Sequence, residues 1–211
     1  MTNASNDLHG NAPDSAPVAL LIIDMINDLE FPEGPDFFAP TLDAAERIAD
    51  LKRRAKSLDI PVIYANDNFG RWRSDFNEVL EHCLNDGVRG QPLAERLRPD
   101  ADDYWVLKPK SSAFFATTLE TLLNYLNAKT LIITGISADA CVLFTANDAY
   151  VRDYNLYIPQ DCVVAALPTY TKDALAYMKR VLKANTTPST DLNLDELLEN
   201  SQPVSEHFQK S

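Results

Sequence analysis

The run Val18–Ile23 (VALLII) constrains the fold more than any other stretch of the chain. It is short and uniformly apolar, it ends at Asp24, and it lacks the alternation that marks a strand with one face in water. Such a run is typical of a strand covered on both faces, as in a parallel sheet. The sequence therefore predicts a sheet with helices packed on each side.

Further apolar runs follow at Pro61–Asn66, Tyr104–Leu107, Leu131–Thr134 and Leu156–Ile158. Between them apolar residues repeat every three or four positions, as from Leu42 to Leu58, which predicts amphipathic helices. A brief β segment is expected near Thr186, and the polar stretch 67–99 is expected to hold one or two short helices. Strands alternating with helices predict an α/β fold with a doubly wound, mostly parallel sheet: a Rossmann-like three-layer α/β/α single domain.

Length and composition place the chain among ordinary globular proteins. Its 211 residues suit one domain, which we expect over residues 17–200. Residues 1–16 are polar and lack the basic start and apolar core of a signal peptide, so we expect a flexible leader there and a polar tail at 201–211. No apolar run approaches the length that spans a membrane.

The charge and the cysteines limit partners and location. A formal net charge of −12 argues against nucleic acid or an anionic membrane as partner, and leaves a small-molecule substrate. Three cysteines, Cys83, Cys141 and Cys162, cannot all pair, and no CxxC is present. This pattern favours a cytoplasmic protein. We interpret Cys83 and Cys162 as structural.

Three residues at strand ends suggest chemistry: Asp24, Lys108 and Cys141. Because parallel strands share one carboxyl edge, these residues can meet there. A carboxylate can take a proton from a thiol, and an ammonium group stabilises negative charge. Cys141 begins an expected helix that Asp139 or Ser137 could cap, and we expect the helix dipole to lower its pKa and favour the thiolate. Singly, each residue also has a structural explanation, because strand-end aspartates often form turns and free cysteines usually pack.

Three sequence blocks carry a resemblance to a known family: LLIIDMINDL, LKPKSSAFFATTL and LIITGISADACVLFTANDAY. In this order, and over roughly residues 17–184, they resemble the isochorismatase-like cysteine hydrolase family. The most specific match is G-x-x-x-x-x-C-V followed by T-A-x-D-A. The family's lysine stands four residues before S-A-F, which selects Lys108 over Lys110.

The resemblance implies a mechanism and a site. Asp24 would accept the thiol proton, Cys141 would attack a carbonyl or carbamoyl carbon, and Lys108 would fix and polarise the pair. Backbone N–H groups of Ser137 and Cys141 would form the oxyanion hole, and a cis peptide bond would join Ile136 to Ser137. The family resemblance also implies a homo-oligomer, a dimer or a tetramer.

Departures from relatives narrow the substrate. Nicotinamidases of this family hold a metal with an Asp-x-His, whereas this chain has Asp67-Asn68-Phe69, and its histidines, His9, His82 and His207, lack ligand spacing. We therefore expect no metal and no other cofactor, and consider nicotinamide a poor substrate. We expect Leu29, Trp72 and Arg73 to line the substrate pocket.

The reaction class follows from the cysteine. Family members that cleave the vinyl ether of isochorismate often lack it, so Cys141 favours cleavage of a C–N bond in an amide, ureido or carbamoyl group. The alternatives are an isochorismatase-type vinyl ether hydrolase and a non-catalytic metabolite-binding α/β domain. No GxGxxG motif follows the first strand to support the second alternative.

Overall fold

A computed structural model describes residues 15–69 and 75–201 of the chain. Its six-stranded sheet has the order β3-β2-β1-β4-β5, with β6 paired to β4, and every strand pairing is parallel. The strands are β1 (Val18–Ile23), β2 (Val62–Asp67), β3 (Tyr104–Lys108), β4 (Thr130–Ile136), β5 (Asn155–Tyr157) and β6 (Val163–Val164).

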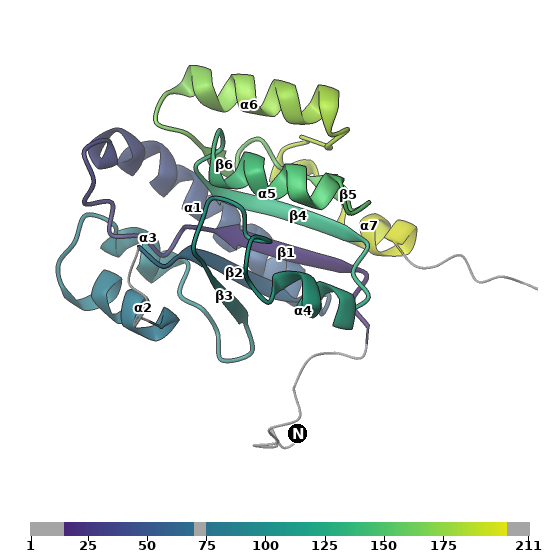
Figure 1. The fold of residues 1–211 in the computed structure, drawn as a ribbon, viewed down its shortest axis with the longest axis horizontal. Coiled ribbons are helices and arrows are strands. Elements are labelled where there is room, and N and C mark those ends of the chain that lie inside the picture. The colour runs from purple at the N-terminus through teal and green to yellow at the C-terminus, as the bar shows by residue number, and fades with distance from the viewer. Residues whose placement is uncertain (1–14, 70–74, 202–211) are drawn as a thin grey trace, which may run out of the picture.

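Helices cover both faces of this sheet. They are α1 (Gly34–Lys56), α2 (Phe76–Asn85), α3 (Gln91–Arg96), α4 (Leu119–Tyr125), α5 (Cys141–Tyr150), α6 (Pro168–Val181) and α7 (Leu194–Ser201), with a short 3₁₀ helix η1 (Ser189–Asp191). In Figure 1, α5 crosses in front of β4 while α1 passes behind β1. The doubly wound three-layer α/β/α fold is therefore confirmed. Among the described helices, none is long and apolar enough to cross a membrane.

The central strand β1 contributes to two separate cores. Its even-numbered side chains pack with α1, through residues that include Ile48 and Leu51. Its odd-numbered side chains pack with α4 and α5, through residues that include Leu123, Val142 and Ala146. Every residue of β1 is buried, which explains why the run shows no alternation of apolar and polar residues.

The order of the strands creates a switch point between β1 and β4. From β1 the chain proceeds through β2 to β3 on one side, and from β4 it proceeds to β5 on the other. In open parallel sheets, ligands bind beyond the carboxyl ends of the strands at such a point. Asp24 follows β1 directly, so the topology places it at this crevice.

Two details of the sheet differ from the sequence prediction. Near Thr186 there is no strand, only a single bridge between Tyr157 and Asn185. The strand β6, by contrast, was not predicted, because two residues cannot show periodicity. The described part of the 67–99 stretch holds two short helices, α2 and α3, in agreement with the prediction.

The packed domain also extends slightly beyond its predicted bounds. Ala16 is buried and donates its N–H to the carbonyl oxygen of Leu126 at 2.7 Å. Ser201 is buried at the end of α7, with its hydroxyl 2.7 Å from that of Thr130. These two residues therefore belong to the domain and not to the leader or the tail. The other residues of those two segments, apart from Ser15, lie outside the described residues.

Gly135 should tolerate no side chain, because β4 passes very close to β1 there. Its φ is +112°, and a Cβ atom would lie 2.0 Å from the carbonyl oxygen of Ile23. We expect Gly135→Ala to lower the free energy of unfolding by more than about 2 kcal/mol, measured by urea denaturation. Gly87 is the matched control: its φ is also positive, but a Cβ there meets nothing within 4 Å. A smaller loss for Gly135→Ala than for Gly87→Ala would contradict the close-approach argument.

Candidate active site

The three predicted residues converge at the carboxyl edge of the sheet. The Lys108 Nζ lies 2.8 Å from Asp24 Oδ2 and 3.3 Å from Cys141 Sγ. Lys108 is fully buried, Asp24 is 5% exposed, and Cys141 is partly buried. A thiol, a carboxylate and an ammonium group therefore form one connected cluster, largely shielded from water.

Asp24 is oriented from two sides. Its backbone lies in the left-handed region, with φ of 53°, and its N–H donates to the carbonyl oxygen of Ala65 at 3.0 Å. Its Oδ1 accepts the N–H of Asp67 at 2.7 Å. Because Oδ1 is held in this way, Oδ2 is the atom that faces Lys108.

Lys108 is the last residue of β3 and reaches four acceptors. Besides Asp24 and Cys141, its Nζ lies 3.4 Å from the carbonyl oxygen of Lys110 and 3.6 Å from Asp67 Oδ2. The parallel register places Lys108 beside Asp67. A buried ammonium group needs this many partners, because burial removes its hydration.

Cys141 is the first residue of α5, and a threonine one turn later in the helix holds its backbone. Thr145 Oγ1 donates to the carbonyl oxygen of Cys141 at 2.7 Å and accepts the N–H of Ala113 at 3.0 Å. Thr145 thus ties the cysteine to the S-A-F segment after Lys108. This threonine is the first residue of the T-A-x-D-A motif, and the motif alone gives no sign of this role.

In the turn before α5, two backbone N–H groups make none of the hydrogen bonds that hold the turn together. The Ile136–Ser137 peptide bond is cis, at the position that the resemblance implied. Ala140 and Val142 both donate to the carbonyl oxygen of Ser137, at 3.1 and 3.0 Å. Within the described part of the chain, the N–H groups of Ser137 and Cys141 take no part in these bonds. They are thus suitable donors for an oxyanion.

The predicted side-chain cap of α5 is wrong. The N-cap residue is Ala140, and no side chain caps the helix. The Ser137 hydroxyl instead donates to the carboxylate of Asp139. In place of a side-chain cap, the Ser137 carbonyl oxygen accepts backbone N–H groups at the start of the helix.

The predicted thiolate is also corrected. Burial, followed by the charge of Asp24, raises the pKa of Cys141 to about 12 despite the opposing effect of Lys108. Burial likewise raises the pKa of Asp24, although Lys108 lowers it in part. Burial lowers the pKa of Lys108, but its acidic neighbours outweigh that effect and raise it. The thiol of Cys141 is therefore neutral near pH 7, and it lies beside the Asp24–Lys108 ion pair.

Of the three predicted pocket residues, the structure describes Leu29. Leu29 is completely buried in the core on the α1 side, whereas Cys141 packs against the core on the other side. Leu29 has a φ of 55°, and its carbonyl oxygen accepts from Arg89. The structure thus gives Leu29 a core position, unlike the predicted pocket wall. Trp72 and Arg73 lie outside the described residues.

Two other polar clusters are occupied by protein groups. His82 lies 2.7 Å from Asp86 and 3.3 Å from Asp28, both on its ring nitrogens. Three aspartates that precede β3 lie close enough together to hold a cation, but Lys52 and Lys56 already pair with them: Asp100, Asp102 and Asp103. Both clusters therefore have a structural explanation.

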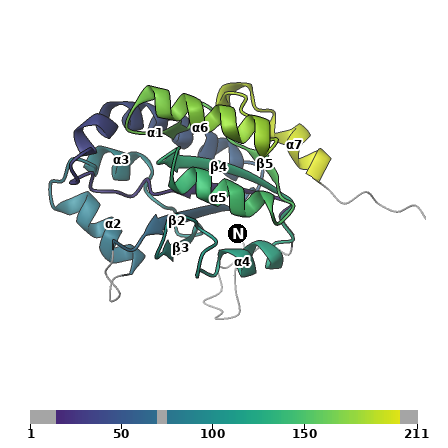
Figure 2. The ribbon, with the colours of Figure 1, turned by 45° about the horizontal axis from the view of Figure 1, so that its top comes forward.

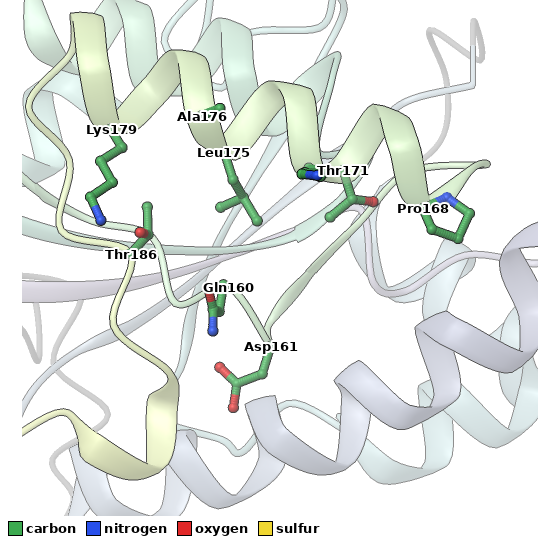
Figure 3. Close-up of a pocket in the computed structure, with 9 residues that line it drawn as sticks. Gln160, Asp161, Pro168, Thr171, Leu175, Ala176, Lys179 and Thr186 are labelled. Carbon is green, nitrogen blue, oxygen red and sulfur yellow. The ribbon is translucent and has the colours of Figure 1, made fainter.

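A groove of 570 Å³ lies along α6 and contains none of the three converging residues. In Figure 3, Asp161 and Thr186 lie on the side of this groove opposite α6. A neighbouring hollow of 650 Å³ continues between α6 and α1, which lie side by side in Figure 2. The carboxylate of Asp161 accepts from the N–H and hydroxyl of Ser189, both at 2.7 Å, and so holds the η1 segment.

The positive charge of Lys108 should stabilise the folded protein, because it pairs with the buried carboxylate of Asp24. We expect Lys108→Met to lower the free energy of unfolding by about 3 kcal/mol near neutral pH, because Asp24 then stays buried without a cation. The pKa of Asp24 rises further in this variant, so the loss should grow as pH rises through that pKa and shrink below it. Urea denaturation at several pH values measures this trend. Adding Asp24→Asn should recover much of the loss, and no recovery would contradict the ion-pair explanation.

Comparisons with known proteins identify the family of this chain. The Isochorismatase domain model matches residues 18–191. An uncharacterized isochorismatase family protein of Bacillus subtilis, YaaI, is 41% identical over 172 residues, covering 82% of this chain and 94% of the relative. The maleamate amidohydrolase of Pseudomonas putida is 28% identical over 151 residues, covering 69% of this chain and 71% of the relative.

Solved structures share the fold. The crystal structure of N-carbamoylsarcosine amidase from Thermoplasma acidophilum matches with a TM-score of 0.64 and 26% identity, covering 83% of this chain and 98% of that one. The family model spans most of the chain. The chain therefore belongs to the isochorismatase family.

Proposed function

We propose that this protein is a cofactor-free cysteine hydrolase that cleaves a C–N bond in an amide, ureido or carbamoyl group of a small molecule. The observation that carries the proposal is the position of Lys108 Nζ, 2.8 Å from Asp24 and 3.3 Å from Cys141. Two relatives, the maleamate amidohydrolase and the N-carbamoylsarcosine amidase, support this reaction class by name.

In the first step, Asp24 takes the thiol proton as Cys141 Sγ attacks the substrate carbon. A raised pKa makes Asp24 a stronger base than an ordinary carboxylate. Lys108 stabilises the sulfur as negative charge develops on it. The neutral resting thiol fits this order, because proton transfer then accompanies attack on the bound substrate.

The attack moves a pair of electrons onto the carbonyl oxygen and gives a tetrahedral oxyanion. The N–H groups of Ser137 and Cys141 would donate to this oxygen from the turn that begins α5. Donors of this kind each contribute about 3 kcal/mol to transition-state stabilisation.

Collapse of the intermediate breaks the C–N bond. Protonated Asp24 returns its proton to the leaving nitrogen, which departs as an amine or ammonia, and a thioester remains on Cys141. Asp24, again a carboxylate, then takes a proton from water as the water oxygen attacks the thioester. The acid product leaves, and the thiol is restored with the proton held by Asp24.

The main alternative is vinyl ether hydrolysis, which the name of the matching family suggests. That reaction protonates a carbon–carbon double bond and needs an acid, but no nucleophilic sulfur. In this structure Cys141 is in direct contact with Lys108 at the centre of the cluster. C–N cleavage uses all three groups, so we prefer it.

We also propose a cytoplasmic homo-oligomer, a dimer or tetramer. Three unpaired cysteines favour the reducing cytoplasm. Two apolar side chains of α5 and its C-cap, Phe144 and Val151, are 56% and 70% exposed, which suits a contact with another subunit.

Removing either reacting group should abolish turnover without unfolding the protein. We expect Cys141→Ala and Asp24→Asn each to lower kcat by at least about 10³-fold, measured by ammonia release from a panel of small amides, ureas and carbamoyl compounds. Thermal melting checks that both variants fold. Cys162→Ala is the control, because that buried cysteine lies in the other core. Retained ammonia release in Cys141→Ala would contradict the proposal.

Alkylation should single out Cys141 among the three cysteines. Cys83 and Cys162 are 1% and 0% exposed, whereas Cys141 is partly open to solvent. We expect brief iodoacetamide treatment, followed by peptide mapping, to modify Cys141 first. Asp24→Asn should slow this modification, because the thiol then loses its base. Equal labelling of Cys83 and Cys141 would remove the argument for a reactive site.

The pH profile should report the ionisation of Asp24. Since the carboxylate form is the base, kcat/KM should fall as pH falls through the raised pKa of Asp24. The midpoint of this acid limb should lie above 3.8, the ordinary value for aspartate. Initial rates across the acidic range measure it. A midpoint at or below 3.8 would show that burial does not control this carboxylate.

A further inference from the structure

A second carboxylate, that of Asp67, faces the Lys108 ammonium group. Asp67 Oδ2 lies 3.6 Å from Lys108 Nζ, and the two residues are register partners in neighbouring strands. The Asp67 side chain is 37% exposed, against 7% for Asp24. One buried cation is therefore flanked by an inner and an outer carboxylate.

The backbone fixes Asp67 in this position. Its Oδ1 accepts the N–H of Phe69 at 2.6 Å, which closes a local turn after β2. Its own N–H donates to Asp24 Oδ1 at 2.7 Å. A single residue thus contacts the base through its backbone and the cation through its side chain.

The proposed reaction creates a need for this second charge. In the tetrahedral intermediate, Asp24 holds the thiol proton and the sulfur is bonded to the substrate carbon, so both groups are neutral. Lys108, which is completely buried, would then be a cation without a counter-ion, a costly arrangement. Asp67 is the remaining carboxylate within 3.6 Å of its nitrogen in the described part of the chain.

We propose that Asp67 is a positioning residue that keeps Lys108 charged and in place while Asp24 carries the proton. This inference rests on the proposed hydrolase mechanism. Asp67 does not touch the reacting atoms in this role; it acts through Lys108. Its partial exposure gives a competing possibility, direct contact with the substrate, which the experiment separates.

The charge of Asp67 should influence Asp24 through the shared cation. In Asp67→Asn the side chain keeps its shape and its turn acceptor but loses its charge. Lys108 then has no second carboxylate beside it, so its positive charge acts more strongly on Asp24. The pKa of Asp24 therefore falls. The acid limb of kcat/KM should move to lower pH by about one unit, and kcat should fall about tenfold because the base is weaker.

The test compares Asp67→Asn with two further variants. Asp67→Glu keeps the charge and should keep the acid limb near its wild-type position. Asp59→Asn makes the same chemical change at an exposed site beyond the other end of β2, where a φ of 55° suits asparagine, and should leave kcat and the limb unchanged. Melting temperatures confirm that all three variants fold.

Two results would overturn the inference. An acid limb in Asp67→Asn that coincides with the wild-type limb shows that Asp67 does not act on the Lys108–Asp24 pair. A tenfold rise in KM with kcat and the limb unchanged shows that Asp67 binds substrate instead.

A second readout needs no substrate. The rate of Cys141 alkylation by iodoacetamide should depend on Asp24 ionisation, and its midpoint should shift in Asp67→Asn in the same direction as the acid limb. An unshifted midpoint contradicts the inference. Failure of the proposed function is distinguishable, because it appears as ammonia release that survives Cys141→Ala, whatever Asp67 does.

Discussion

The fully buried ammonium group of Lys108 is the interaction on which the site depends. A charge at 0% exposure is stable only if several acceptors replace its lost hydration. Those acceptors come from the end of β1, the end of β2, the loop after β3 and the start of α5. The ammonium group can therefore be buried only where segments remote in sequence end at the same point. The parallel sheet provides such a point, because its strands share one carboxyl edge.

The same burial explains the protonation states. Desolvation raises the pKa of both Asp24 and Cys141, so Cys141 rests as a thiol, and in the proposed mechanism it loses its proton only to Asp24 as it attacks the substrate. A free thiolate is the form that oxidants attack. The resting thiol is thus less nucleophilic than a thiolate but is protected from oxidation. In the proposed mechanism Asp24, which is in contact with the thiol, removes its proton when the substrate is bound.

The sequence predicted those features that depend on local pattern and order. The uniform burial of β1 follows from VALLII, and the strand ends at Asp24 and Lys108 follow from the positions of the runs. The pKa of Cys141 could not be predicted in this way, because the helix dipole is visible in the sequence whereas burial and the distance to Asp24 are not. The prediction that Leu29 lines a pocket was wrong for a similar reason. A left-handed backbone conformation places its side chain in the core, and sequence periodicity gives no sign of that conformation. Asp67 was noticed only as a remnant of a metal motif, since its contact with Lys108 depends on strand register.

Register also explains why the cluster can form at a switch point at all. Gly135 pairs with Ile23, and the absence of a Cβ lets β4 lie against the carbonyl oxygen of β1 where any side chain would collide. Asp24 follows Ile23 directly, and the Ile136–Ser137 turn follows Gly135 directly. The close contact between the two strands therefore sets how far Asp24 lies from the turn that carries Cys141. Gly135, which has no side chain, thus sets the distance that the proposed proton transfer requires, because an aspartate side chain is too short to cross a wider gap.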